Sequence, residues 1–243
     1  MLEQNKIYNG DCLELMKDIE DKSIDMILCD PPFGTTNCKW DSVIPFKPLW
    51  EQYKRVIKED GALVLFGSQP FTSALIMSNP EMFKYEWIWE KTLASGQLNA
   101  KIMPMKIHEN IIVFGKGKIK YNPQMGIGEP YTIKRNIISQ DCYGKQKPNI
   151  KVNNGERYPK SVINFPNSRI KNGYATQKPV SILEYLIKTY TNDEGECVLD
   201  SCIGSASTII ACKNTGRNYI GIEKNEKVFN MAIDRISGYI HLS

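Results

Sequence analysis

Apolar and polar residues follow two patterns along the first half of the chain. Short, largely apolar runs at residues 24–29 and 62–66 predict buried strands, and residues 45–59 place apolar side chains at helical spacing with Gly61 after the expected helix end. The same reasoning predicts strands at residues 6–10, 85–89 and 110–114, the last two as antiparallel neighbours, and a helix at residues 71–78. This half therefore alternates strands with helices.

The second half repeats that alternation. A helix is expected at residues 179–191, where Ser181 and Glu184 have capping-box spacing. Strands are expected at residues 197–199 and 219–222, and helices at residues 206–214 and 227–239. Alternation of this kind predicts an α/β fold, a doubly wound, mostly parallel sheet with helices on both faces.

Composition narrows the class of protein. The chain has 243 residues with 42% apolar and 24% charged side chains, which is typical of one globular domain, or one with a sizeable insertion. No apolar run is long enough for a membrane span, and the first residues are too polar for a signal peptide. Seven cysteines without a CxxC pair and two histidines favour a reduced, cytoplasmic protein with no metal site and no membrane attachment.

The net charge of +4 is unevenly distributed. Residues 115–172 contain twelve Lys or Arg and three acids, so this segment carries +9 and the remainder −5. Tyrosines are interleaved with the bases, and Asn, Gly and Pro are dense, which favours loops over regular elements. Such a segment is either a solvated lysine-rich region or a polyanion-binding face. We expect an insertion at residues 118–172 between a first half, residues 1–117, and a second half, residues 173–243.

The tetrapeptide Asp30-Pro31-Pro32-Phe33 directly follows the strand predicted at residues 24–29. It can serve simply to end the strand, because proline cannot continue a ladder. Ligands of open α/β sheets, however, bind beyond the carboxyl ends of strands. There a carboxylate, a carbonyl and an aromatic ring suit a planar group that bears an exocyclic amine.

A second loop, from Asp200 to Ser207, also lies between a strand and a helix, and Glu223 ends the next predicted strand. A strand, a small-residue turn, a helix and a second strand that ends in an acid are typical of a site for an adenosine ribose. Neither Gly-x-Gly-x-x-Gly nor Gly-Lys-Ser/Thr occurs. The pattern therefore favours a nucleoside cofactor without phosphates.

These loops resemble the amino-group DNA methyltransferases of the beta type, which use S-adenosylmethionine. Residues 30–33 match the family's catalytic Asp-Pro-Pro-Tyr/Phe motif, residues 200–207 its cofactor loop, residues 176–179 its Thr-Gln-Lys-Pro segment and residues 9–12 its Gly-Asp motif. Ser201 and Cys202 depart from the usual Pro-Phe, and Ala206 from the second Gly. The resemblance implies a circularly permuted class I methyltransferase fold, in which Asp30 and Asp200 end neighbouring strands.

The resemblance also implies roles for individual residues. The catalytic residues would be Asp30, Pro31, Pro32 and Phe33; the cofactor residues Asp11, Cys12, Thr176, Gln177, Lys178, Asp200, Cys202, Gly204, Ser205, Glu223 and Lys224; and the DNA-binding residues Lys134, Arg135, Lys145, Lys147, Arg157 and Arg169. Cys29 is expected to point away from the site into the core, together with Trp50, Trp87 and Trp89. Glu109 is given a structural role at a strand entrance.

The activity so implied is methyl transfer from S-adenosylmethionine to adenine N6 in double-stranded DNA, after the base has left the stack. Methylation at cytosine C5 is disfavoured because it needs a nucleophilic cysteine, normally after proline, and no Pro-Cys occurs. Cytosine N4 methylation, which uses the same amine chemistry, and a catalytically inactive DNA-binding relative stay open as alternatives. The short chain favours a homodimer, which would extend its contact with DNA.

Overall fold

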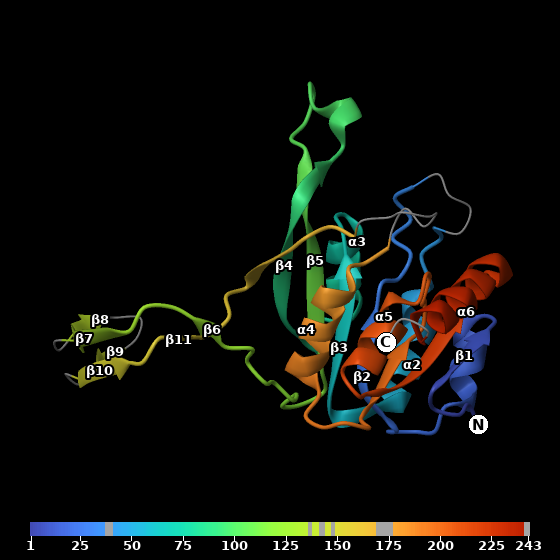
Figure 1. Cartoon of the computed structure of the whole chain (residues 1–243), viewed down its shortest axis with the longest axis horizontal. Helices are drawn as coiled ribbons and strands as arrows, with labels where there is room; N and C mark the ends of the chain where they lie inside the picture. Colours follow the sequence, from blue (N-terminus) through green and yellow to red (C-terminus); the bar gives the residue numbers. More distant parts are fainter. Residues whose placement is uncertain (37–40, 136–137, 141–143, 147–148, 169–176, 241–243) are drawn as a thin grey trace. The chain divides into compact units, whose positions relative to one another are not determined.

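The computed structural model describes residues 1–36, 41–135, 138–140, 144–146, 149–168 and 177–240. Within these residues, eight strands form one sheet in the order β1-β14-β13-β2-β3-β5-β4-β12 (Figure 1). The strands are β1 (Lys6–Asn9), β2 (Ile24–Cys29), β3 (Ile57–Gly67), β4 (Phe83–Ser95), β5 (Lys106–Phe114), β12 (Val162–Phe165), β13 (Cys197–Asp200) and β14 (Asn218–Glu223). β5 is antiparallel to β3 and β4, and the other neighbours are parallel. The prediction of a mostly parallel sheet is confirmed.

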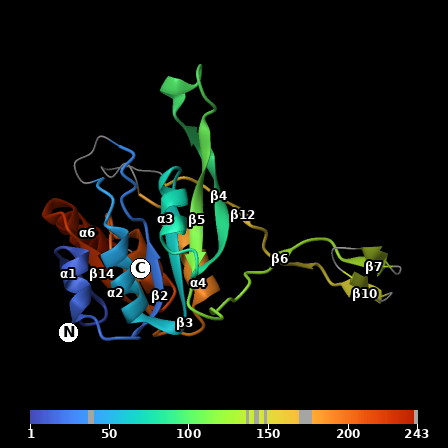
Figure 2. The same cartoon turned by 180° about the vertical axis from the view of Figure 1, so that it is seen from behind.

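Helices cover both faces of this sheet. They are α1 (Cys12–Leu15), α2 (Phe46–Val56), α3 (Phe71–Ser78), α4 (Val180–Tyr190), α5 (Ser207–Asn214) and α6 (Glu226–Ile240). The helices α4, α5 and α6 lie on one face of the sheet (Figure 1), and α1, α2 and α3 lie on the opposite face (Figure 2). Side chains of the first three belong to one apolar core, and side chains of the other three to a second core. The fold is therefore doubly wound.

β2 lies between these two cores and shows the alternation expected of a strand. Met26 and Leu28 pack into the first core, whereas Ile27 and Cys29 pack into the second. All four side chains are buried. Cys29 is thus a core residue as predicted, and so are the three buried tryptophans, Trp50, Trp87 and Trp89. The expectation that Cys29 points away from the site is wrong, because Cys29 also lines the pocket at the end of β2.

One predicted helix end is wrong. α2 ends at Val56, three residues earlier than expected, because Ile57 already pairs with Ile24 as the first residue of β3. Gly61, which was expected to follow the helix, lies inside β3. A Cβ at this position would come within 2.8 Å of the Asp25 carbonyl oxygen, so glycine allows the close approach of two strands here and does not end a helix.

The start of α4 also differs from its prediction. Pro179 is the N-cap, and no side chain caps the first turn. The expected capping box of Ser181 and Glu184 does not form, because the Glu184 carboxylate accepts a hydrogen bond from Asn214 of α5. Glu184 thus ties two helices together instead of closing its own helix.

The two predicted loops meet at the centre of the sheet. β13 is the parallel neighbour of β2, with Leu199 opposite Ile27. Asp200 and Asp30, which lie one and three residues further along their strands, therefore end adjacent strands, as the permuted order predicts. Such adjacent carboxyl ends of parallel strands are where open α/β sheets bind ligands.

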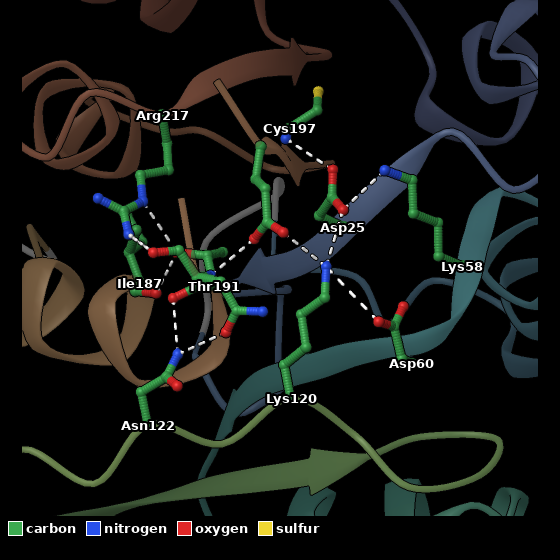
Figure 3. Close-up of polar contacts among 11 residues, drawn as sticks. Asp25, Lys58, Asp60, Lys120, Asn122, Ile187, Thr191, Cys197 and Arg217 are labelled. Carbon is green, nitrogen blue, oxygen red and sulfur yellow. Dashed lines mark hydrogen bonds and ion pairs between the residues drawn. The ribbon is translucent and has the colours of Figure 1, made fainter. Parts of the chain in front are cut away.

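An ion-pair cluster lies at the other end of these strands (Figure 3). Asp25, near the start of β2, accepts hydrogen bonds from the Cys197 N–H at 3.0 Å and from Lys58 Nζ and Lys120 Nζ at 2.7 and 3.1 Å. Lys120 Nζ also donates to Glu196 at 2.7 Å. The Asp25 side chain is 4% exposed and that of Lys120 12%. Lys120 therefore anchors the segment after β5 to the beginnings of strands β2 and β13.

Residues 123–160 form a separate compact unit. Its strands are β6 (Gly126–Ile127), β7 (Tyr131–Arg135), β8 (Ile138–Gln140), β9 (Gly144–Gln146), β10 (Asn149–Asn153) and β11 (Glu156–Arg157). They form three antiparallel pairs, β7 with β10, β6 with β11 and β8 with β9. The expectation of loops without regular elements is wrong here, because backbone pairing between distant residues forms ladders that local composition does not reveal.

The compact unit is shorter than the insertion predicted at residues 118–172. Before the unit in the sequence, Lys120 belongs to the main sheet through the ion-pair cluster of Figure 3. After the unit, β12 pairs with β4, and Trp89 Nε1 donates to the Phe165 carbonyl at 2.9 Å. Both ends of the predicted insertion thus belong to the larger unit.

Candidate functional site

One pocket, with a volume of about 880 Å³, lies at the carboxyl ends of β2 and β13. It brings together every predicted catalytic and cofactor residue that the structure describes. These are Asp11, Cys12, Asp30, Pro31, Pro32, Phe33, Gln177, Lys178, Asp200, Cys202, Gly204, Ser205, Glu223 and Lys224. Thr176 lies outside the described residues. Loops that are some 170 residues apart in the chain thus share one cavity.

Asp30 is the acid at the end of β2. Its side chain is 29% exposed as a whole, but the Oδ1 atom is buried and has no hydrogen-bond partner among the described residues. Burial is the main cause that raises the pKa of Asp30, and the Glu109 carboxylate raises it further, whereas the Lys178 ammonium opposes the shift. A buried acceptor without a partner normally requires one, so Oδ1 is a binding atom for a donor that enters the pocket.

Lys178 is the cation that neutralises Asp30. Its Nζ donates to Asp30 Oδ2 and lies 3.3 Å from Glu109 Oε2, while the other Glu109 oxygen pairs with Lys91. Burial would lower the pKa of Lys178, but the carboxylates of Asp30 and Glu109 outweigh it and raise that pKa. Two cations and two anions therefore alternate along one wall of the pocket.

Sequence reasoning missed Glu109 as a residue of this site. The structure places it in the pocket wall on β5, opposite Trp89 of β4, and not merely at a strand entrance. The Glu109 side chain is 14% exposed, and the Lys178 and Lys91 ammonium groups lower its pKa against the effect of burial. The only sequence signal that could have indicated this role was an acid placed directly before the strand predicted at residues 110–114.

The cofactor half of the pocket is built on Glu223, the last residue of β14. Its Oε2 accepts a hydrogen bond from the Gly204 N–H at 3.0 Å, and its Oε1 accepts one from the Asn225 N–H at 2.9 Å. Gly204 and Ala206 both adopt left-handed backbone conformations, with φ of +49° and +61°. Ala206 thus adopts the left-handed backbone conformation at a position where the motif usually has glycine.

The departures at Ser201 and Cys202 are accommodated in the packing. The Ser201 hydroxyl is buried, 2.6 Å from the Tyr53 hydroxyl and 3.3 Å from Cys29 Sγ. The Cys202 N–H donates to Asp200 Oδ1 at 3.0 Å. Burial raises the pKa of Asp200 to about 6. The altered loop therefore has its polar groups satisfied, and it still presents an acid at the end of β13.

The charges of the pocket fit a nucleoside better than a phosphorylated cofactor. The basic side chains among the described lining residues are Lys91, Lys178 and Lys224, and each is paired with a carboxylate. Lys224 pairs with Asp11 at 2.9 Å, and this hydrogen bond is the main cause that lowers the pKa of Asp11. The carboxylates of Glu223 and Asp11 remain as acceptors for hydroxyl and amino groups. The residues present therefore fit S-adenosylmethionine.

Two of the predicted DNA-binding residues, Lys134 and Arg157, have described side chains, and both belong to the smaller unit. Lys134 is exposed on β7. Arg157 instead donates to the carbonyls of Glu129 and Glu156 and lies 4.6 Å above the Tyr131 ring, so its guanidinium holds its own unit together. The side chains of the remaining candidates, Arg135, Lys145, Lys147 and Arg169, lie outside the described part of the chain.

Among the described residues, no group of three or more His, Cys, Asp or Glu side chains is placed to hold a metal ion. In the same part of the chain, no helix combines the length and apolar character needed to cross a membrane.

Comparison with known proteins agrees with this geometry. Type II methyltransferase M1.MboII of Moraxella bovis is 30% identical over 260 residues, which cover 96% of either chain. DNA adenine methyltransferase YhdJ of Escherichia coli (strain K12) is 26% identical over 259 residues, which cover 99% of this chain and 85% of the relative. Both relatives thus match nearly the whole chain.

Solved structures show the same fold. The M1.HpyAVI–SAM complex has a TM-score of 0.66 at 24% identity, covering 95% of this chain and 98% of that one. PvuII DNA methyltransferase (cytosine-N4-specific) has a TM-score of 0.72 at 14% identity, covering 97% and 87%. Residues 24–234 match the family described as DNA methylase. The chain therefore belongs to the N6/N4 DNA methylase family, whose members are S-adenosylmethionine-dependent methyltransferases.

Proposed function

We propose that this DNA methyltransferase transfers the methyl group to adenine N6 in double-stranded DNA. The observation that carries the proposal is Asp30 Oδ1, a buried carboxylate oxygen without a hydrogen-bond partner among the described residues, in a pocket shared with the cofactor loop. An exocyclic amine supplies the N–H donor that this oxygen lacks. Because the amine cannot be reached inside a duplex, the base must leave the stack to enter the pocket.

The catalytic loop provides three groups for such a base. Asp30 Oδ1 and the Pro31 carbonyl accept the two amine hydrogens, and the Phe33 ring offers a face for stacking. Phe33 is itself supported by Phe71 of α3, with ring centroids 5.2 Å apart. S-adenosylmethionine supplies an electrophilic methyl group when bound. With both amine hydrogens held, the nitrogen lone pair points out of the base plane, and positioning provides most of the rate enhancement.

The cofactor site that we propose consists of the residues around Glu223. Glu223 and Asp11 are the acceptors for the hydroxyl and amino groups of the nucleoside. Cys12, Gln177, Asp200, Cys202, Gly204, Ser205 and Lys224 line the same pocket, and Thr176 is proposed from the sequence motif alone.

Adenine is favoured over cytosine N4 by the catalytic acid. Enzymes of the N4 type more often carry serine where this chain has Asp30, and the relative named a DNA adenine methyltransferase matches 99% of the chain. The structure named as cytosine-N4-specific shares the fold at 14% identity. Both reactions use the same amine chemistry, so base identity is decided by experiment.

The basic insertion is the proposed duplex-binding surface. Exposed lysine and arginine side chains of the insertion, of which Lys134 is a described example, would contact the DNA phosphates. Other polar side chains would read the edges of the DNA bases. We also propose a homodimer, which would double the contact area on DNA, and a cytoplasmic enzyme, because its substrate is DNA.

The test replaces Asp30. Asp30→Ala should abolish methyl transfer to unmethylated plasmid DNA while equilibrium dialysis still detects binding of S-adenosylmethionine. Asp193→Ala, an exposed acid outside the pocket, is the matched control and should retain activity. Sequencing DNA from cells that express the wild type and lack other methylation identifies both the base and its target sequence. Full activity of Asp30→Ala would sink the proposal, and absence of cofactor binding by the wild type would favour an inactive relative.

A further inference from the structure

Lys178 and Asp30 place a hydrogen-bond donor beside an acceptor at the bottom of the catalytic pocket. The Lys178 ammonium has three N–H groups, of which Asp30 Oδ2 takes one and Glu109 Oε2, at 3.3 Å, faces another. Among the described residues, no further oxygen or nitrogen partner of this ammonium is found, and two buried carboxylate oxygens beside it, Asp30 Oδ1 and Glu109 Oε2, have no hydrogen-bond partner. One N–H and one carboxylate oxygen of the same ion pair are therefore available to a ligand.

Rings surround this ion pair and shape what can reach it. The Lys178 Nζ lies 5.0 Å from the Phe66 ring centroid and 5.9 Å from that of Phe33. The Lys178 side chain is only 10% exposed, and the two rings beside its ammonium suit a flat ligand. Because this ammonium is largely shielded from solvent, a hydrogen bond to it is stronger than one made in water.

Adenine and cytosine share one feature that matches this arrangement. In each base the exocyclic amine lies next to a ring nitrogen that is an acceptor, N1 in adenine and N3 in cytosine. In the duplex the same two atoms face an acceptor and a ring N–H of the partner base. An acceptor next to a donor is thus the complement of this edge.

We propose that the Asp30–Lys178 ion pair binds the Watson–Crick edge of the flipped base, with Asp30 accepting from the amine and Lys178 donating to the adjacent ring nitrogen. This inference rests on the proposed function and makes Lys178 a base-binding residue, whereas the family motif suggested a cofactor contact. It also explains how guanine is rejected. Guanine carries a ring N–H beside its amine, and that hydrogen would face the ammonium donor.

The charge environment keeps Lys178 able to donate. The Asp30 and Glu109 carboxylates raise the pKa of Lys178 above its ordinary value despite burial, so the ammonium form persists at neutral pH. Glu109 is in turn paired with Lys91, whose side chain is 13% exposed. The two carboxylates therefore keep the Lys178 ammonium charged, and Lys178 also lines the pocket.

The experiment uses duplexes that differ in one atom of the target base. Once the target sequence is known, methyl transfer in a single turnover is compared for adenine and for 1-deazaadenine, in which a C–H replaces N1. Placing an abasic site opposite the target in all duplexes removes any contribution from base pairing. The wild type should be about 10- to 100-fold slower on 1-deazaadenine, the range expected for loss of one hydrogen bond from a charged donor.

The variant Lys178→Met removes the donor and keeps the length of the side chain. It should be slow on both substrates, with a rate ratio near one. Lys91→Met is the matched control, because it removes the far cation of the same wall and should retain the wild-type ratio. If cytosine is the base that accepts methyl, 3-deazacytosine takes the place of 1-deazaadenine.

Each outcome separates the inference from the function on which it rests. Equal wild-type rates on the base and on its deaza analogue overturn the inference, and this measurement does not depend on how well a variant folds. A Lys178→Met protein that keeps the full ratio also overturns it. In both cases transfer to ordinary DNA leaves the proposed function standing. Methylation of cytosine alone refutes the adenine assignment, and the comparison with 3-deazacytosine then decides the inference. Failure of the wild type to methylate either base refutes the proposed function, and the inference with it.

Discussion

Asp200 is a buried acid whose protonation should make the stability of the protein depend on pH. It ends β13 and is 3% exposed, and burial raises its pKa from 3.8 to about 6, against the hydrogen bonds from Thr208 and the Cys202 N–H. The folded state therefore binds this proton more tightly than the unfolded state. At 1.36 kcal/mol per pKa unit, the shift corresponds to about 3 kcal/mol of folding free energy, present below pH 4 and lost as pH rises through 6.

Asp200→Asn removes the titration and retains an oxygen that can accept from the Cys202 N–H. Relative to wild type, the free energy of unfolding of the variant should rise by about 2 kcal/mol between pH 4.5 and 7.5, because about 1 kcal/mol of the wild-type contribution is already lost at pH 4.5. Urea unfolding followed by the fluorescence of the buried tryptophans, without cofactor, measures this difference. Comparing two proteins at each pH cancels the titration of the other acids.

The control variant is Asp193→Asn, which changes an exposed acid and should differ from wild type by the same amount at every pH. A difference between Asp200→Asn and wild type that is likewise flat from pH 4.5 to 7.5 would refute the reasoning. We further expect the stabilised variant to bind S-adenosylmethionine more weakly, because the charge that costs stability lies in the cofactor pocket.

Two other predictions concern a buried cation and an exposed one. Lys120→Met should lower the free energy of unfolding by about 2–4 kcal/mol, because it removes the more buried of the two lysine partners of Asp25, and urea unfolding measures this. Lys58→Met, which removes a 40% exposed partner of the same carboxylate, should cost under about 1 kcal/mol; equal losses would contradict the argument. In a plot of log affinity for duplex DNA against log salt concentration, Lys134→Ala should make the negative slope less steep by about 1. Substitution of another exposed lysine, Lys188→Ala, should leave the slope unchanged, and fluorescence-anisotropy titrations measure both. Equal slopes for all three proteins would remove Lys134 from the DNA-binding surface.

The central part of the fold was predictable because its signals are local. The buried run of β2 followed by Asp30, and the strand and turn that surround Asp200, each occupy a few consecutive residues whose pattern determines their structure. Helix ends were less predictable: α2 ends where Ile57 pairs with Ile24, a partner more than thirty residues away. Local pattern alone cannot show such competition between a helix and a strand.

The wall of the catalytic pocket could not be predicted from the sequence. Lys91 and Glu109 come from two strands of a hairpin, and Lys178 precedes α4 more than sixty residues later. Only the tertiary fold brings these charges together, so a charged residue before a strand was interpreted as structural. The pairs of short strands in the compact unit were missed for the same reason, because paired residues lie as far apart in the sequence as Gly126 and Arg157 and the segment is rich in turn-forming residues.

The order of strands in the sheet has a consequence for how the protein is made. β1 joins the sheet only through β14, and β13 and β14 separate β1 from β2, although these two strands are close neighbours in the sequence. On the ribosome, the nascent chain therefore carries β2 with one open edge until nearly the whole protein has been synthesised. Pairing over such separations makes folding slow, and a product truncated before residue 197 would expose an apolar strand edge. Premature termination should thus yield aggregates rather than a partly active enzyme.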